Sequence, residues 1–103
     1  MKTHNKLVRD KIPEIIAASG KTCTVKYLTN AEYLDALYAK LDEEMREYQE
    51  SKNPEELVDL LEVIYALAAV SGLNLVDLRE LYYKKAKERG QFEKKIMLLS
   101  EDD

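Results

Sequence analysis

The chain has 103 residues, and we take residues 1–103 as a single domain because this length is typical of one hydrophobic core. Hydrophobic residues make up 46% and charged residues 35% of the chain, a composition that excludes a disordered protein and a membrane protein. A formal net charge of −4 argues against binding to a nucleic-acid polymer, which needs a basic surface. The low content of Gly and Pro favours an all-α fold over a turn-rich β fold.

The first predicted elements lie in the N-terminal third. A helix is expected from an N-cap at Asp10, with Pro13 in its first turn, to a stop at Gly20. Residues 23–28 alternate and are rich in β-forming residues, which permits a short strand. Thr29, followed three residues later by Glu32, reads as a capping box that opens a second helix.

Similar local signals predict two further helices. The second helix should run to about Ser51, and Asn53 with Pro54 should open a third helix that ends at Ser71, before Gly72. Asn74 paired with Asp77 predicts a fourth helix, which should close at Gly90. We therefore expect a helical bundle of about four helices.

The second and third helices are joined by few residues, so they should form a central antiparallel hairpin. The third helix carries apolar side chains on two faces, one around Leu60 and Ile64 and the other around Val63 and Val70. One small domain cannot cover both faces. We therefore expect a homodimer or homotetramer with this helix near the shared core.

The single cysteine, Cys23, cannot form an internal disulfide, which favours a reducing cytoplasm. We recognise no export signal and no apolar run long enough for a spanning helix, so we expect no membrane association.

Charge is unevenly distributed along the chain. Residues 1–31 carry six Lys or Arg against two acids, and residues 32–62 carry eleven carboxylates against three basic residues. Residues 63–100 are again net positive. An acidic middle therefore lies between two basic flanks.

Some of these carboxylates fall where apolar residues are expected. Spacings of three and four predict that the second helix buries Leu34, Leu37, Leu41, position 44 and Tyr48, but position 44 is Glu. Glu47 projects to the edge of the same face.

The third helix repeats this anomaly. Glu56 borders one apolar face and Asp59 falls within the other. Measured from the turn between the helices, the side chains of Glu44, Glu47, Glu56 and Asp59 should lie at axial levels within roughly 8 Å of one another.

Four carboxylates do not gather against apolar side chains unless a compensating charge is present or some of them are protonated. Oxygen-only ligands favour Mg²⁺, with Mn²⁺ as a substitute, over zinc. The competing interpretation is an ordinary solvated helix surface, because E-x-x-E pairs arise freely in charged helices. Two acidic pairs on neighbouring helices, with members on buried edges, favour the metal site.

The basic flanks could hold a phosphorylated substrate that the carboxylates alone would repel. The candidates are Lys6, Arg9 and Lys11 in the N-terminal segment and Lys84, Lys85 and Arg89 in the fourth helix. For the second group the alternative is simple: basic residues in a last turn complement the helix dipole.

The sequence resembles the all-α nucleoside triphosphate pyrophosphohydrolase superfamily, which includes the MazG-type enzymes, dimeric dUTPases and phosphoribosyl-ATP pyrophosphohydrolase. The family pattern E-E-x-x-E followed by E-x-x-D is matched by Glu43, Glu44, Glu47, Glu56 and Asp59. The segments KLVRDKIPEII (6–16) and KKAKERGQFEKKI (84–96) resemble the small phosphoribosyl-ATP pyrophosphohydrolase-like branch.

This resemblance implies hydrolysis of a nucleotide between its α and β phosphates, releasing a nucleoside monophosphate and pyrophosphate. Glu44, Glu47, Glu56 and Asp59 would be the Mg²⁺ ligands, and Glu44 or Glu47 would orient the attacking water. Lys85 and Arg89 would contact phosphate, with Lys84, Lys6, Arg9 and Lys11 beside them. We expect Glu43 to project away as a solvated neighbour, and Glu62 to lie too far round its helix to bind metal.

Two alternatives remain open at this stage. The chain could be a nucleotide or metal-binding sensor without turnover, or a structural helical dimer whose acids are only surface. Whether the substrate is a nucleoside triphosphate or a phosphoribosyl nucleotide is also left open by the sequence.

Overall fold

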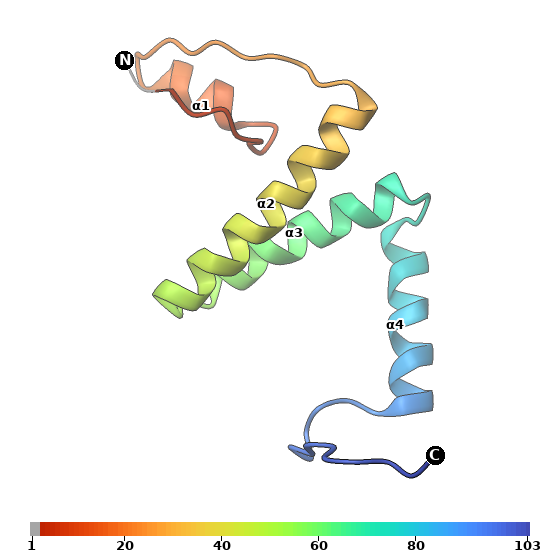
Figure 1. Ribbon diagram of the computed structural model, residues 1–103. Helices are drawn as coiled ribbons and strands as arrows, with labels where there is room; N and C mark the ends of the chain where they lie inside the picture. Colours follow the sequence, from red (N-terminus) through yellow and green to blue (C-terminus); the bar gives the residue numbers. More distant parts are fainter. Residues whose placement is uncertain (1–2) are drawn as a thin grey trace.

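The computed structural model describes residues 3–103 and contains four helices, with no strand among those residues (Figure 1). They are α1 (Ile12–Ala18), α2 (Asn30–Ser51), α3 (Glu55–Val70) and α4 (Leu75–Arg89). The helices α2 and α3 run antiparallel and are packed side by side (Figure 1). The predicted all-α class and central hairpin are thus confirmed.

The helix starts follow the local sequence closely. At the start of α2 the Thr29 hydroxyl accepts from the Glu32 N–H at 3.2 Å, and the Glu32 carboxylate accepts from the Thr29 N–H at 3.0 Å. Asn74 and Asp77 form the same reciprocal pair at the start of α4. The predicted capping box at Thr29 and the predicted helix start at Asn74 are both confirmed, and each pair satisfies backbone donors that the helix itself leaves unpaired.

Three local predictions were wrong. Asp10 does not cap α1: Lys11 is the N-cap, and among the described residues no side chain caps that helix. The cap of α3 is Pro54, one residue later than predicted, although the Asn53 side chain still accepts from the Glu55 N–H at 3.0 Å. Residues 23–28 form no strand, because a strand needs a partner for its backbone groups and this segment runs exposed.

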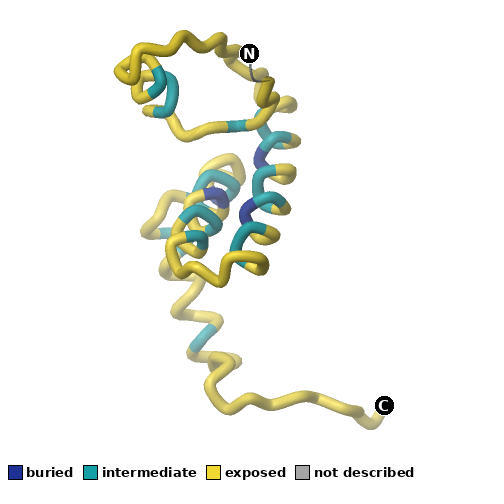
Figure 2. The backbone as a smooth tube through the Cα atoms, turned by 90° about the vertical axis from the view of Figure 1, so that its left-hand side faces the viewer, coloured by how far each residue is buried: buried dark blue, intermediate teal, exposed yellow. Residues whose placement is uncertain are grey.

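The core of the molecule lies between α2 and α3. Leu37 on α2 and Val63 on α3 are buried, as is Glu44 (Figure 2). The predicted seam of α2 is confirmed, since Leu34, Leu41 and Tyr48 are half-buried and flank the buried positions. Because α3 turns its Val63 face to α2, an outer stripe formed by Leu57, Leu61 and Ile64 remains exposed.

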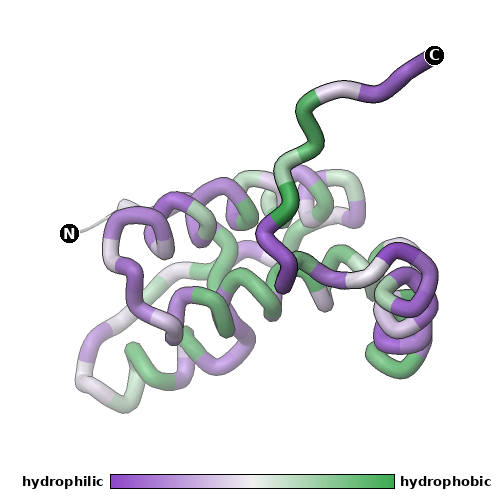
Figure 3. Tube along the Cα trace, turned by 90° about the horizontal axis from the view of Figure 1, so that it is seen from below, coloured by the Kyte–Doolittle hydropathy of each residue, from purple (hydrophilic) through white to green (hydrophobic). Residues whose placement is uncertain are grey.

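The rest of the chain is loosely packed. Within residues 3–103, α3 and α4 are the only other helices in contact, so α1 packs against no helix. The radius of gyration is 18.1 Å, against about 13 Å for a compact domain of this length. The apolar residues Ile96–Leu99 are 74–89% exposed and project from the helices (Figure 3). In the part of the chain that the structure describes, no helix is both long and apolar enough to cross a membrane.

Candidate metal centre

Two groups of carboxylates lie at the turn end of the α2–α3 hairpin. Glu43, Glu44 and Glu47 form one group, and Glu44, Glu56 and Asp59 form the other. Within each group, one oxygen from every residue lies within 4.8 Å of the others. The four carboxylates predicted to converge are therefore brought together, and Glu44 belongs to both groups.

Glu44 is the centre of this cluster. It projects from the buried seam of α2 and is only 5% exposed. Its Oε1 lies 3.2 Å from Lys40 Nζ, whereas its buried Oε2 has no hydrogen-bond partner among residues 3–103. Burial raises the pKa of Glu44, and the neighbouring charges of Glu47 and Asp59 raise it further against the opposing effect of Lys40. A buried carboxylate oxygen without a partner is costly and therefore points to a ligand.

Glu43 was predicted to project away from the cluster, and this was wrong. It is half-buried and pairs with Lys40 Nζ at 3.1 Å and with Lys6 Nζ at 3.3 Å. Burial opposes its ionisation, but these two lysines hold the pKa of Glu43 below its ordinary value. A helical wheel places the Cβ atom only, and a flexible Glu side chain can bend toward nearby cations.

Lys40 is a site residue that the sequence analysis missed. Burial alone would lower the pKa of Lys40, but hydrogen bonds to Glu43 and Glu44 outweigh it and raise that pKa. Its spacing could have revealed it, because Lys40 precedes Glu43 by three residues and Glu44 by four on one helix.

The N-terminal segment supplies two of its three predicted cations to this cluster. Arg9 donates to Asp59 Oδ1 at 2.8 Å, across 50 residues of sequence, and Lys6 contacts Glu43. Lys11 instead occupies the N-cap of α1 and forms no ion pair within residues 3–103. Counted over the described residues, the cluster thus gathers five carboxylates and three cations, a formal charge of −2.

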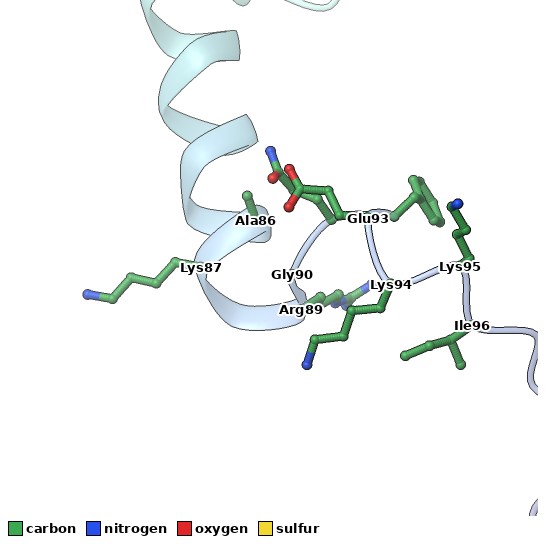
Figure 4. Close-up of a pocket in the computed structure, with 10 residues that line it drawn as sticks. Ala86, Lys87, Arg89, Gly90, Glu93, Lys94, Lys95 and Ile96 are labelled. Atoms are coloured by element: carbon green, nitrogen blue, oxygen red, sulfur yellow. The ribbon is translucent and has the colours of Figure 1, made fainter.

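The basic residues of α4 are not brought to the cluster. Asp59 lies roughly 17 Å along α3 from its end at Val70, and α4 then leads away for about 21 Å to Arg89 (Figure 1). Arg89 instead lines a hollow between the last turn of α4 and the segment 90–96, which contains none of the clustered carboxylates (Figure 4). Lys84 lies in a separate shallow hollow on α4. Within one chain, the α4 residues Lys84, Lys85 and Arg89 therefore lie apart from the acids, and their expected contact with phosphate stays a prediction.

The donor set fits a hard divalent cation. Each of the two carboxylate groups offers oxygen ligands only, with no His or Cys, which suits Mg²⁺ or Mn²⁺ better than zinc. One such ion would give Glu44 Oε2 a partner and would neutralise the residual charge of −2. These residues therefore fit the metal expected from the sequence.

Part of the chain is similar to a bacterial protein. The sequence is 58% identical to an uncharacterized protein of Mycolicibacterium smegmatis over 41 residues, which is 40% of this chain. The match spans 42% of the length of that relative. No protein-family model matches the sequence. No solved structure matches it significantly.

Proposed function

We propose that this protein is a Mg²⁺-dependent nucleotide pyrophosphohydrolase that cleaves between the α and β phosphates. The observation that carries the proposal is Glu44, a buried carboxylate with an unpartnered oxygen that is common to two oxygen-only ligand groups. The acidic pattern and the two flanking segments that resemble the all-α nucleoside triphosphate pyrophosphohydrolase superfamily support this chemistry. We propose membership of that superfamily on the same grounds.

In this proposal Glu44, Glu47, Glu56 and Asp59 hold the cation, and Glu43 is a fifth carboxylate at its edge. Bound Mg²⁺ supplies Lewis-acid polarisation of the phosphate and a more acidic water. A carboxylate oxygen of Glu44 or Glu47 orients the attacking water and takes its proton. Lys6 and Arg9 lie beside the acids and can bind phosphate oxygens, where their charge offsets the negative charge that develops during transfer.

We also propose that the protein functions as a homo-oligomer, a homodimer or homotetramer. The chain exposes 9792 Å², whereas a compact monomer of its mass would expose about 6,000 Å². A standard interface buries only about 800 Å² of each partner, so the excess is ample for one. A second copy could cover the outer stripe Leu57, Leu61 and Ile64 and bring its own Lys84, Lys85 and Arg89 to the acidic cluster.

This arrangement would place the basic end of one chain against the acidic hairpin of another. Residues 84–95 carry six Lys or Arg against two Glu, and the hairpin segment is strongly negative. The two surfaces are therefore electrostatically complementary. The exposed free thiol of Cys23 is compatible with a reducing compartment, and we place the protein in the cytoplasm.

The test is a panel of nucleoside triphosphates and phosphoribosyl-ATP, incubated with the full chain with and without Mg²⁺ and read out as released pyrophosphate. The proposal expects release from at least one nucleotide in the presence of Mg²⁺ and none after chelation. Release that is insensitive to chelation, or no release from any nucleotide, would contradict it. In the latter case, a rise in melting temperature with Mg²⁺ and nucleotide would point to a sensor, and no rise to a structural dimer.

A further inference from the structure

The N-terminal arm, defined here as residues 3–11, is joined to the hairpin by two ion pairs. In the described part of the chain α1, which follows the arm, packs against no helix. The two ion pairs of the arm are Lys6 with Glu43 at 3.3 Å and Arg9 with Asp59 at 2.8 Å. Both pairs end on carboxylates of the candidate metal centre.

Arg9 and a divalent cation would compete for the Asp59 carboxylate. The guanidinium holds Asp59 Oδ1 in a charge-assisted hydrogen bond. A dication bound by the same carboxylate would lie within a few ångströms of that positive charge, and the two would repel. Because both members of the pair are about half exposed, the pair is screened by water and Arg9 can leave it at modest cost.

Phosphate offers Arg9 a better partner. A guanidinium forms paired hydrogen bonds with phosphate oxygens, and a polyphosphate bound through a metal on the carboxylates would lie close to the arm. Moving Arg9 and Lys6 from carboxylates to phosphate would also restore negative charge to the metal ligands. Each ligand would then favour binding of the other, which is positive coupling between two sites.

We propose that the N-terminal arm is an electrostatic latch in which Arg9 exchanges Asp59 for a substrate phosphate when metal and phosphate bind together. The proposal rests on the metal centre proposed above. It assigns Arg9 two successive partners, and it makes the protein a weak binder of metal alone and a strong binder of metal with a polyphosphate. Arg9 is on this account a residue that couples the two ligands.

The first experiment measures Mn²⁺ binding by electron paramagnetic resonance, without nucleotide and without turnover. Arg9→Gln should bind Mn²⁺ about threefold to tenfold more tightly than wild type, because the competing cation is gone. Lys26→Gln is the matched control. It breaks an exposed ion pair of 2.9 Å, with Glu32, outside the acidic cluster, and should leave Mn²⁺ affinity unchanged.

The second experiment titrates inorganic pyrophosphate, the proposed product, into each variant with saturating Mg²⁺ in a calorimeter. Arg9→Gln should bind pyrophosphate about tenfold more weakly, since it loses a charge-assisted hydrogen bond. Arg9→Lys should keep the wild-type Mn²⁺ affinity, because the positive charge remains. It should lose part of the pyrophosphate affinity, because lysine cannot form the paired hydrogen bonds of a guanidinium.

The outcomes separate the two proposals. If wild type binds Mn²⁺ but Arg9→Gln binds it equally or less well, the latch is wrong and the metal centre stands. If Arg9→Gln gains Mn²⁺ affinity without losing pyrophosphate affinity, the exchange of partners is likewise overturned. If wild type binds no Mn²⁺, the metal centre fails and the latch fails with it.

Discussion

The α2–α3 hairpin and the C-terminal part of the chain, α4 with residues 90–103, are built in opposite ways. The hairpin buries Leu37 and Val63 and carries carboxylates inside its interface. By contrast α4 buries no residue, and the apolar tail beyond it is exposed. The hairpin is therefore stabilised by its own packing, although it contains a buried carboxylate that is electrostatically unfavourable. The C-terminal part instead exposes apolar and basic side chains to solvent.

Because of this difference, the proposal assigns metal binding to the hairpin and assembly to the C-terminal part. A buried, unpartnered carboxylate in the best-packed region is a cost that a bound cation would remove. Exposed apolar and basic residues in the least-packed region are what a second copy would use. In the proposal the hairpin would provide the metal ligands, and α4 would provide contacts to a partner chain.

The largest effect is expected from Glu44→Gln, which removes the shared ligand. Pyrophosphate release should fall at least about 100-fold, since even indirect supports of metal sites cost 10–100-fold. The matched control is Glu62→Gln, the same change one turn from Asp59 but outside both carboxylate groups, which should retain activity near that of wild type. Equal losses in the two variants would show that the hairpin acids are not ligands.

Mixing two inactive variants tests whether the hairpin and α4 of different chains form one site. Glu44→Gln lacks a proposed metal ligand and Arg89→Ala lacks a proposed phosphate contact, so each variant alone should be nearly inactive. If partners exchange freely in a dimer, the mixture should recover about a quarter of wild-type activity, because half of the dimers then contain one intact site of two. A mixture that stays inactive, although light scattering and differential tagging show exchange, would mean that Arg89 acts within its own chain or not at all.

A charge placed on the outer stripe of α3 should separate the subunits. The chain mass is 11.9 kDa, and light scattering of wild type should give twice or four times that value. Leu61 is already exposed in the single chain, so Leu61→Glu should reduce the mass without unfolding the hairpin. Ala31→Glu, at an exposed position of α2, is the control and should leave the mass unchanged. A monomeric wild type would remove the case for a shared site.

The smallest effect concerns the start of α2, at the opposite end of that helix from the carboxylate cluster. Hydrogen bonds from the Thr29 N–H and from Lys26 lower the pKa of Glu32 from 4.5 to about 2. A carboxylate with a lowered folded-state pKa contributes stability that is fully present above 4.5 and is lost as pH falls toward 2. Glu32→Gln should therefore melt with less pH dependence between these values than wild type. Parallel melting curves for the two proteins would show that the capping box does not persist in solution.

The elements within the hairpin were largely predictable from the sequence, because spacing and caps act locally. The seam of α2 and the capping box at Thr29 follow from periodicity and from three-residue signals. The position of Glu44 followed from the same periodicity. Side-chain bending was not predictable in this way, and for that reason Glu43 was placed outside a cluster that it joins.

The long-range contacts were not predictable from local patterns. The pair Arg9 and Asp59 depends on the path of residues 21–29 between α1 and α2, which carry no regular structure. The separation of Arg89 from the acids depends on the turn after Gly72, whose direction no periodicity encodes. Neither the Arg9–Asp59 pair nor the separation of Arg89 from the acids corresponds to a fixed spacing in the sequence.

The most direct test of the central claim is thermal melting of wild type and Glu44→Gln at neutral pH, with and without Mg²⁺. Because burial raises the pKa of Glu44, its ionised form costs stability above that pKa and the cost vanishes at acidic pH. Without metal, Glu44→Gln should therefore melt higher than wild type, by about 4 °C for 1 kcal/mol regained. Mg²⁺ at 100 times its dissociation constant should stabilise wild type by about 2.7 kcal/mol and leave Glu44→Gln unchanged. A wild type that does not respond to Mg²⁺, or a variant that responds equally, would contradict a metal centre built on Glu44.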